Sequence, residues 1–253
     1  MCILFVAVNQ HEDYPLVIAA NRDEFFARET AGSHYWKPNQ NILAGQDLVA
    51  GGTWMGINKQ GYLASLTNIR DPNKVNPKAI SRGELVSHYL QHPTESYWQQ
   101  LTSSKDNYNG YNLLFGKWDK LAVYNNHSNE LQTLTDGYYG LSNADLNSPW
   151  PKINKGVAAL EEYCKNGHDI HSNILFELLL DTYKAPDAEL PKTGVPIEWE
   201  RHVSSIFIQG NDYGTRSSTV VKIDKKHNVF WHEKTYDSEA NCTSSQNFNF
   251  SIN

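Results

Sequence analysis

Two short apolar runs at the beginning of the chain constrain its fold more than any other feature. Residues 3–8 (ILFVAV) and 16–20 (LVIAA) flank a polar segment that ends with Pro15. Short apolar runs bounded by polar residues and proline are typical of buried strands, so residues 2–9 and 16–21 predict a β-hairpin. This hairpin would return the polar cluster at residues 21–24 (NRDE) to the beginning of the chain.

Composition limits the class of protein and its partners. A chain of 253 residues with 40% hydrophobic residues can form a large core without cross-links. The net charge of −6 provides no basic surplus for nucleic acid or anionic lipid. Three distant cysteines, Cys2, Cys164 and Cys242, predict no disulfide framework and indicate a reducing compartment. Because no apolar run reaches about 18 residues, we expect a cytoplasmic protein without a transmembrane segment.

The rest of the chain alternates between groups of strands and pairs of helices. Helical periodicity appears in four segments, and Ser81 and Glu84 predict a capping box before the first of them. Antiparallel strands with helix pairs on their outer faces give a layered α+β sandwich. Nothing resembles a linker, so we expect a single domain over residues 1–253. Closing strands are expected at residues 205–209, 217–224, 229–235 and 247–252.

Cys2 is the first candidate for chemistry. An isolated free cysteine usually behaves as a small buried hydrophobic residue. Its position next to Met1 changes the interpretation, because removal of Met1 would give Cys2 both a thiol and an α-amine. An unperturbed α-amine has a pKa of about 7.7–8.0 and can accept the thiol proton near neutral pH. Cys2 would then supply nucleophile and base together.

The polar cluster after the second strand has two interpretations. It can be a capped, solvated turn, or a group of side chains that surrounds Cys2. Arg22 would stabilise a thiolate, and Asp23 would hold the ammonium group. Adjacent strand residues point to opposite faces, so we expect both to reach Cys2 only if the chain turns there.

Two asparagines and one arginine are further candidates. Asn68 and Asn143 stand at strand ends, where an amide can either cap a turn or donate to an oxyanion, which is worth about 2.7–4 kcal/mol in catalysis. Arg216 precedes an apolar run, where a charge needs a partner. His168 and His171 lack a third ligand at suitable spacing, so no metal site is predicted.

Several motifs together resemble the NRDE family, also called the transport and Golgi organisation protein 2 family. The resemblance covers nearly the whole chain. Its motifs are residues 1–3 (MCI), 20–25 (ANRDEF), 51–56 (GGTWMG), 66–68 (LTN), 82–86 (RGELV), 140–143 (GLSN), 149–152 (PWPK) and 213–216 (YGTR).

The resemblance implies a branch of the N-terminal nucleophile hydrolases, with an αββα fold of two antiparallel sheets between helix layers. The related penicillin V acylase and bile salt hydrolase group consists of cysteine amidases. The likeness implies a nucleophile at Cys2, catalytic roles for Asp23 and Arg216, and oxyanion contacts from Asn68 and Asn143. The amidases separate their first arginine from the aspartate by two residues, whereas here Arg22 and Asp23 are adjacent. Asn21, Glu24 and Trp54 complete the expected substrate-binding set.

Three functions are compatible with these residues. The first is a cysteine amidase that cleaves a linear acyl amide and needs no cofactor. The second is a non-catalytic carrier of haem or of an acyl-lipid metabolite on the same fold, because eukaryotic members of the family are linked to haem and lipid-metabolite handling. The third is an interaction protein with a decayed site. Thiol reactivity and ligand binding distinguish them.

Overall fold

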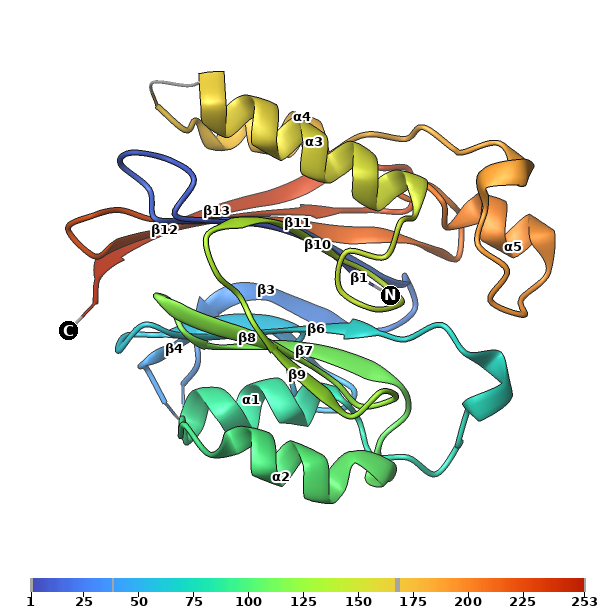
Figure 1. The fold of residues 1–253 in the computed structure, drawn as a ribbon, viewed down its shortest axis with the longest axis horizontal. Coiled ribbons are helices and arrows are strands. Elements are labelled where there is room, and N and C mark those ends of the chain that lie inside the picture. Colours follow the sequence, from blue (N-terminus) through green and yellow to red (C-terminus); the bar gives the residue numbers. More distant parts are fainter. Residues whose placement is uncertain (1, 38, 167–168, 253) are drawn as a thin grey trace.

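Two antiparallel sheets lie face to face, with helices covering the outer side of each (Figure 1). The computed structural model describes residues 2–37, 39–166 and 169–252. The chain forms strands, a helix pair, strands, a helix pair and strands in this order, as the sequence predicts, with one further short helix at Ile197–His202 that was not expected. The fold is therefore the expected α+β sandwich with four layers.

The first sheet contains the predicted hairpin at its centre. Its strands are hydrogen-bonded in the order β10-β1-β2-β11-β12-β13. Cys2 is paired with Arg22 at one end of the hairpin, and Val8 with Leu16 at the other. The strands span Cys2–Val8 (β1), Leu16–Phe25 (β2), Gly137–Leu141 (β10), Tyr213–Ile223 (β11), Asn228–Tyr236 (β12) and Cys242–Ser251 (β13).

The second sheet follows the chain order from β3 to β9. It contains a second hairpin, formed by β5 and β6, in which Met55 is paired with Ser65. The strands span Thr30–Tyr35 (β3), Ile42–Asp47 (β4), Met55–Asn58 (β5), Tyr62–Asn68 (β6), Tyr111–Lys117 (β7), Lys120–Asn125 (β8) and Glu130–Thr133 (β9).

Each outer face has its own helices. In Figure 1, α1 and α2 cover the second sheet, and α3 and α4 cover the first. The α-helices span Gly83–Gln91 (α1), Tyr97–Ser104 (α2), Pro151–Asn166 (α3), Ser172–Leu179 (α4) and Ile197–His202 (α5). Short 3-10 turns span Pro72–Lys74, Lys105–Asn107 and Asp187–Glu189.

Two local predictions are wrong. The capping box does not form: α1 has Arg82 as its N-cap residue with no side-chain cap, and Glu84 accepts a hydrogen bond from the Tyr108 hydroxyl at 2.6 Å. Residues 205–209 form no strand. They are apolar because Phe207 and Ile208 are buried. Their bonds do not form a ladder: the Phe207 amide donates to the Asp181 carbonyl, and of the described residues of β11 Ile208 bonds to Thr215 alone, through the threonine hydroxyl and backbone amide.

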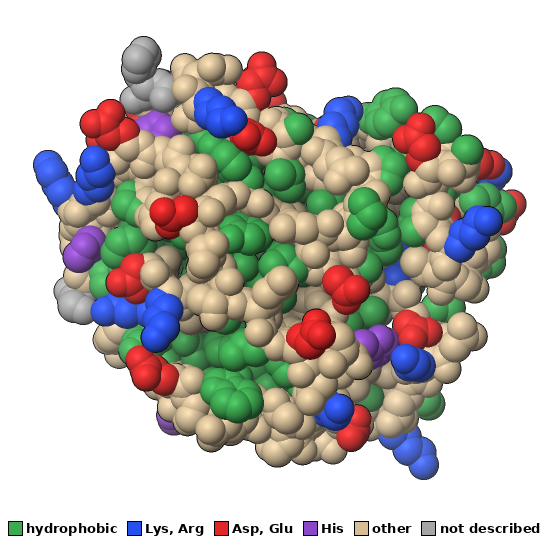
Figure 2. Space-filling view, viewed as in Figure 1, with side chains coloured by type: hydrophobic (Ala, Val, Ile, Leu, Met, Phe, Trp, Pro, Cys, Tyr) green, Lys and Arg blue, Asp and Glu red, His purple; other side chains and the backbone are tan. Residues whose placement is uncertain are grey.

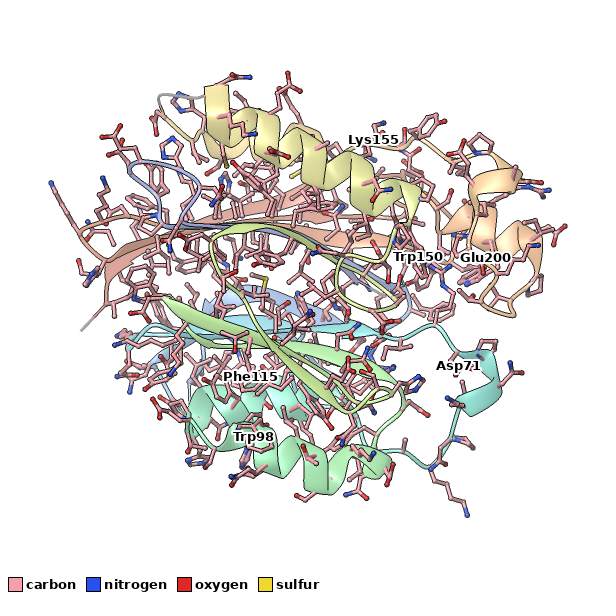
Figure 3. The ribbon with its side chains drawn as sticks, viewed as in Figure 1. Asp71, Trp98, Phe115, Trp150, Lys155 and Glu200 are labelled. Atoms are coloured by element: carbon pink, nitrogen blue, oxygen red, sulfur yellow. The ribbon has the colours of Figure 1, made fainter. Side chains whose placement is uncertain are left out.

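Three apolar clusters hold the layers together. The largest lies between the sheets and includes Leu4, Met55 and Trp231. A second lies under α1 and α2 and includes Phe115, which is labelled in Figure 3. The third, under α3 and α4, includes Phe5. Burial of this apolar surface is the main force that fixes the layers.

The surface gives no sign of a strongly charged face on the side shown in Figure 2, where acidic and basic side chains are interspersed. In the described parts of the chain, no helix is both long and apolar enough to cross a membrane.

Candidate active site

Cys2 lies at the end of the first sheet, where one strand begins and its neighbour continues. β1 begins at Cys2, but β2 continues past Arg22 to Phe25, where β11 is its one partner among the described residues. The half-buried Cys2 borders a cavity of about 320 Å³, the Cys2 cavity. Residues lining it include Arg22, Asp23, Glu24, Arg28, Asp47, Trp54, Asn68 and Arg82.

The surroundings of the Cys2 thiol act in opposite directions. Burial raises its pKa and has the largest effect, and the charge of Asp23 also raises it. The guanidinium of Arg22 and a hydrogen bond from the Asp23 backbone amide to the sulfur lower it. The charge of the N-terminal amine lowers it more than either, and the two groups of β2 that favour the thiolate come from adjacent residues.

Asp23 is a buried carboxyl group beside Cys2. It is 2% exposed, and its Oδ1 accepts a hydrogen bond from the Thr215 hydroxyl at 2.7 Å. Burial raises its pKa to about 6. At neutral pH Asp23 is thus mostly a carboxylate, with a proton affinity above that of an exposed aspartate.

Arg22 and Asp23 both line the Cys2 cavity although β2 makes no turn. The expectation that the chain must turn is wrong, because β1 begins beside Arg22 and Asp23 reaches the Cys2 sulfur through its backbone amide, at the edge of β2. The Arg22 guanidinium lies 4.2 Å from the centre of the Trp54 ring, and its Nη2 is 4.0 Å from Glu24. These contacts hold the charge of Arg22 at the cavity wall.

The two candidate oxyanion residues are connected to each other. Asn68, at the end of β6, lines the Cys2 cavity, whereas Asn143 is not part of its described lining. The Asn143 amide donates to the Asn68 carbonyl at 3.0 Å. The Ser142 hydroxyl lies 3.0 Å from Asn143 Oδ1 and 3.2 Å from the Cys2 carbonyl. Asn143 therefore links β1 of the first sheet to β6 of the second.

Asn21 and Arg216 point elsewhere. The Asn21 amide donates to the carbonyls of Leu179 and Ile206, on the helix side of the sheet. Arg216 Nη1 donates to three carbonyls of the turn after β2, those of Phe25, Phe26 and Arg28. Arg216 lines a second cavity, described below, and is not part of the Cys2 cavity's described lining.

Three charged residues of the Cys2 cavity were not among the sequence candidates. Arg28 and Asp47 form an ion pair at 2.7 Å, and Arg82 donates to the Gly110 carbonyl at 2.9 Å. Arg82 is the first residue of the family motif at residues 82–86, and this motif could have identified it as a candidate. Arg28 and Asp47 had no comparable signal, since each is an ordinary charged residue in sequence.

A buried charged network lies next to Asn143. Arg70 forms an ion pair with Glu200 of α5, and its Nη2 lies 3.4 Å from Asn143 Oδ1. The Arg70 guanidinium is also 4.9 Å from the centre of the Trp150 ring, and Figure 3 shows Trp150 and Glu200 close together. The Lys152 ammonium donates to the Val203 carbonyl at 2.9 Å, and burial lowers its pKa to about 7.

The arrangement provides a sulfur nucleophile, a neighbouring acid and several donors around one polar cavity. These are the components of nucleophilic attack on a carbonyl group. Within the described residues, no three His, Cys, Asp or Glu side chains gather in a way that could hold a metal ion. The predicted base is the α-amine of Cys2, which requires removal of Met1, and Met1 lies outside the described residues.

Several solved structures are similar to this one. The Caenorhabditis elegans N-acylethanolamine-hydrolyzing acid amidase ortholog has 13% identity and a TM-score of 0.47, and the match covers 87% of this chain and 92% of that one. The C2A mutant of the conjugated bile acid hydrolase from Clostridium perfringens has 12% identity and a TM-score of 0.44, covering 99% and 92%.

Sequence comparison gives a closer relationship. The mouse Transport and Golgi organization 2 homolog is 32% identical, over 100% of this chain and 99% of its own length. The Drosophila melanogaster Transport and Golgi organization protein 2 is 30% identical, over 93% of this chain and 92% of its own length. The family model described as Transport and Golgi organisation 2 matches residues 1–238. The chain therefore belongs to the Transport and Golgi organisation 2 family, as its motifs indicated.

Proposed function

We propose that the protein is a cysteine amidase that cleaves a linear acyl amide, with Cys2 as nucleophile once Met1 has been removed. The observation that carries this proposal is the position of Cys2: it begins β1, borders a cavity, and accepts a hydrogen bond from the Asp23 backbone amide at its sulfur. A thiol at the beginning of a strand is accessible to a substrate and held rigidly.

The proposed reaction has two steps. The thiol sulfur attacks the amide carbonyl carbon, and the α-amine of Cys2 takes the thiol proton and passes it to the departing amine. Water then hydrolyses the thioester, which releases the acid and restores the thiol. Asp23 lies beside Cys2 and would hold the ammonium group between these steps.

The remaining candidates have separate proposed roles. Asn68 lines the Cys2 cavity and would donate to the oxyanion, and Asn143 would orient it through the Asn68 carbonyl. Arg22 would favour the thiolate. Arg216 would act indirectly, because it holds the turn that leads to Arg28.

The wall of the Cys2 cavity supports a polar substrate more than an apolar cargo. Polar and charged side chains together predominate in the lining, and the apolar ones include Trp54, Leu66 and Ile80. Carriers of apolar ligands usually have mainly apolar walls. The carrier of haem or an acyl-lipid metabolite is therefore the weaker candidate.

Hydrolysis of acyl p-nitroanilides of increasing chain length tests the proposal, together with the intact mass of the untagged protein. We expect wild type to lack Met1 and to react with iodoacetamide at Cys2. Cys2→Ala should lower the rate by about a thousandfold or more, since the nucleophile is lost. Cys242→Ala, at an exposed position, is the matched control and should keep full activity.

An active Cys2→Ala variant would refute the amidase, as would full activity in protein that retains Met1. Absorbance titration with haem addresses the carrier directly. Saturation at micromolar concentration in both wild type and Cys2→Ala would favour the carrier instead.

A further inference from the structure

A second cavity, of about 190 Å³, adjoins the Cys2 cavity and has no role in the proposed reaction. It is lined by β3 of the second sheet and by β11, β12 and β13 of the first. Arg22 and Trp54 line both cavities, with the guanidinium stacked on the indole ring. Ser217, Glu233 and Tyr236 line the second cavity and not the first.

Three buried polar atoms of this wall lack hydrogen-bond partners among the described residues: Arg22 Nη1, the Ser217 hydroxyl and the Tyr236 hydroxyl. No described residue accepts a hydrogen bond from Arg22 Nη1, and none forms a hydrogen bond with the Ser217 hydroxyl. Arg22 and Ser217 are only 6% and 4% exposed. A buried polar group without a partner destabilises the fold by about 1–3 kcal/mol, and more when it is charged. Because their residues line the cavity, a polar occupant of the cavity is the available partner for these atoms.

A β-bulge explains how the sequence creates this wall. Thr215 is paired with Asp23 and Ser217 with Arg22, so Arg216 is an extra residue with no partner on β2. A bulge of this kind redirects side chains next to functional sites. Here it leaves Ser217 beside Arg22, and it turns Arg216 toward the carbonyls after β2.

The charges of the cavity define the chemistry of its occupant. Arg22 and Arg216 contribute two guanidinium groups, which can only donate. The opposing acid is Glu233, which is 1% exposed and already accepts hydrogen bonds from the Ser33 amide and the Thr219 hydroxyl. Even with Glu233 ionised, the wall has a net positive charge and an excess of donors.

We propose that the second cavity binds an oxyanion, the carboxylate, sulfonate or phosphate group of a small ligand, between Arg22 and Ser217. A guanidinium with a free Nη1 and a neighbouring hydroxyl match two oxygens of such a group. This inference does not depend on the proposed amidase, because it rests on the wall of the second cavity alone. Ordered water is the competing occupant, since polar cavities of this size hold water.

Anion binding is measured as the concentration-dependent rise of melting temperature in inorganic phosphate and in acetate, against chloride at equal ionic strength. We expect a saturable rise with at least one of them in wild type. Phosphate is tetrahedral and the acetate carboxylate is planar, so the anion that gives the larger rise shows which shape fits the cavity. In crystals grown with sodium selenate, anomalous scattering should place the anion beside Arg22 and Ser217.

Variants distinguish the two cavities. Ser217→Val replaces the unpartnered hydroxyl with methyl groups, which cannot bond to an anion and which take up space in the wall, so it should weaken binding by about tenfold or more. Thr243→Trp changes an exposed residue at the rim of the cavity and should block entry without disturbing the buried wall. Arg82→Gln is the control, because Arg82 lines only the Cys2 cavity of the two, and it should leave the affinity unchanged.

Two results would overturn the proposal. In the first, Arg82→Gln abolishes binding while Ser217→Val and Thr243→Trp leave it intact, which places the anion in the Cys2 cavity. In the second, neither anion gives a saturable effect and the crystals show only water beside Ser217. Because these measurements require no hydrolysis, an inactive enzyme would not affect them.

Discussion

The two outer faces of the sandwich bury different kinds of polar group. Under α1 and α2, the buried polar side chains include tyrosines such as Tyr89 and Tyr97, and burial raises their pKa so that they stay neutral. On the side of α3 and α5, the buried groups are Asp23, Lys152 and Glu200. There, burial brings the pKa of Asp23 to about 6 and that of Lys152 to about 7.

The difference favours the side of α3 and α5 as the functional face. Neutral tyrosines are buried at little expense when their hydroxyl groups have partners. Buried ionisable groups lose hydration, and even well-paired ones add little net stability. Their concentration next to Cys2 is therefore poorly explained by stability. Perturbed acids and bases of this kind are typical of functional sites.

The largest effect on stability is expected when the buried ion pair is broken. Glu200→Ala leaves the Arg70 guanidinium buried without its carboxylate. Removing one partner of a buried pair destabilises a protein by about 3–5 kcal/mol, because the remaining charge is uncompensated. Urea denaturation of wild type and variant measures this loss.

A double variant provides the control. Arg70→Met with Glu200→Leu removes both charges and keeps the volume, so most of the lost stability should return. If the double variant is as unstable as Glu200→Ala alone, packing of α5 and not charge explains the effect, and the contrast between the two faces loses its strongest support.

The second-largest effect is a pH dependence of the free energy of unfolding, and we expect it from the side of α3 and α5. Burial raises the pKa of Asp23 from 3.8 to about 6. Below pH 3.8 both states hold the proton, and between about pH 4 and 6 only the folded state retains it, so the free energy of unfolding falls as the pH rises. A shift of about two units corresponds to about 3 kcal/mol.

Asp23→Asn should remove this fall, so the difference between wild type and variant measures it. Urea denaturation at intervals from pH 4 to 7 gives both curves. Other carboxylates contribute equally to the two proteins and cancel in the difference. Curves that remain parallel over this range would show that Asp23 keeps an ordinary pKa in the folded protein.

The sequence predicted the architecture better than the site. The apolar runs of β1 and β2 specify the central hairpin, because burial requires this pattern wherever the strands lie. The extension of β2 to Phe25 was missed, since its polar residues resemble a turn. The association of Lys152, Arg70 and Glu200 depends on contacts between distant segments, which no local pattern encodes. Arg216 was displaced from the expected site by a bulge whose position only pairing with β2 reveals.

The smallest effect on stability is expected on the side of α1 and α2. The Tyr97 hydroxyl is buried and donates to the Leu85 carbonyl at 2.8 Å. Tyr97→Phe removes one neutral hydrogen bond and should lower the free energy of unfolding by about 1 kcal/mol. Because the pKa of Tyr97 is raised by burial, this loss should be constant from pH 4 to 9 in urea denaturation. A loss that changes with pH as strongly as that of Asp23→Asn would mean that charge is buried on both faces, and the α3 side would no longer be distinguished as the functional one.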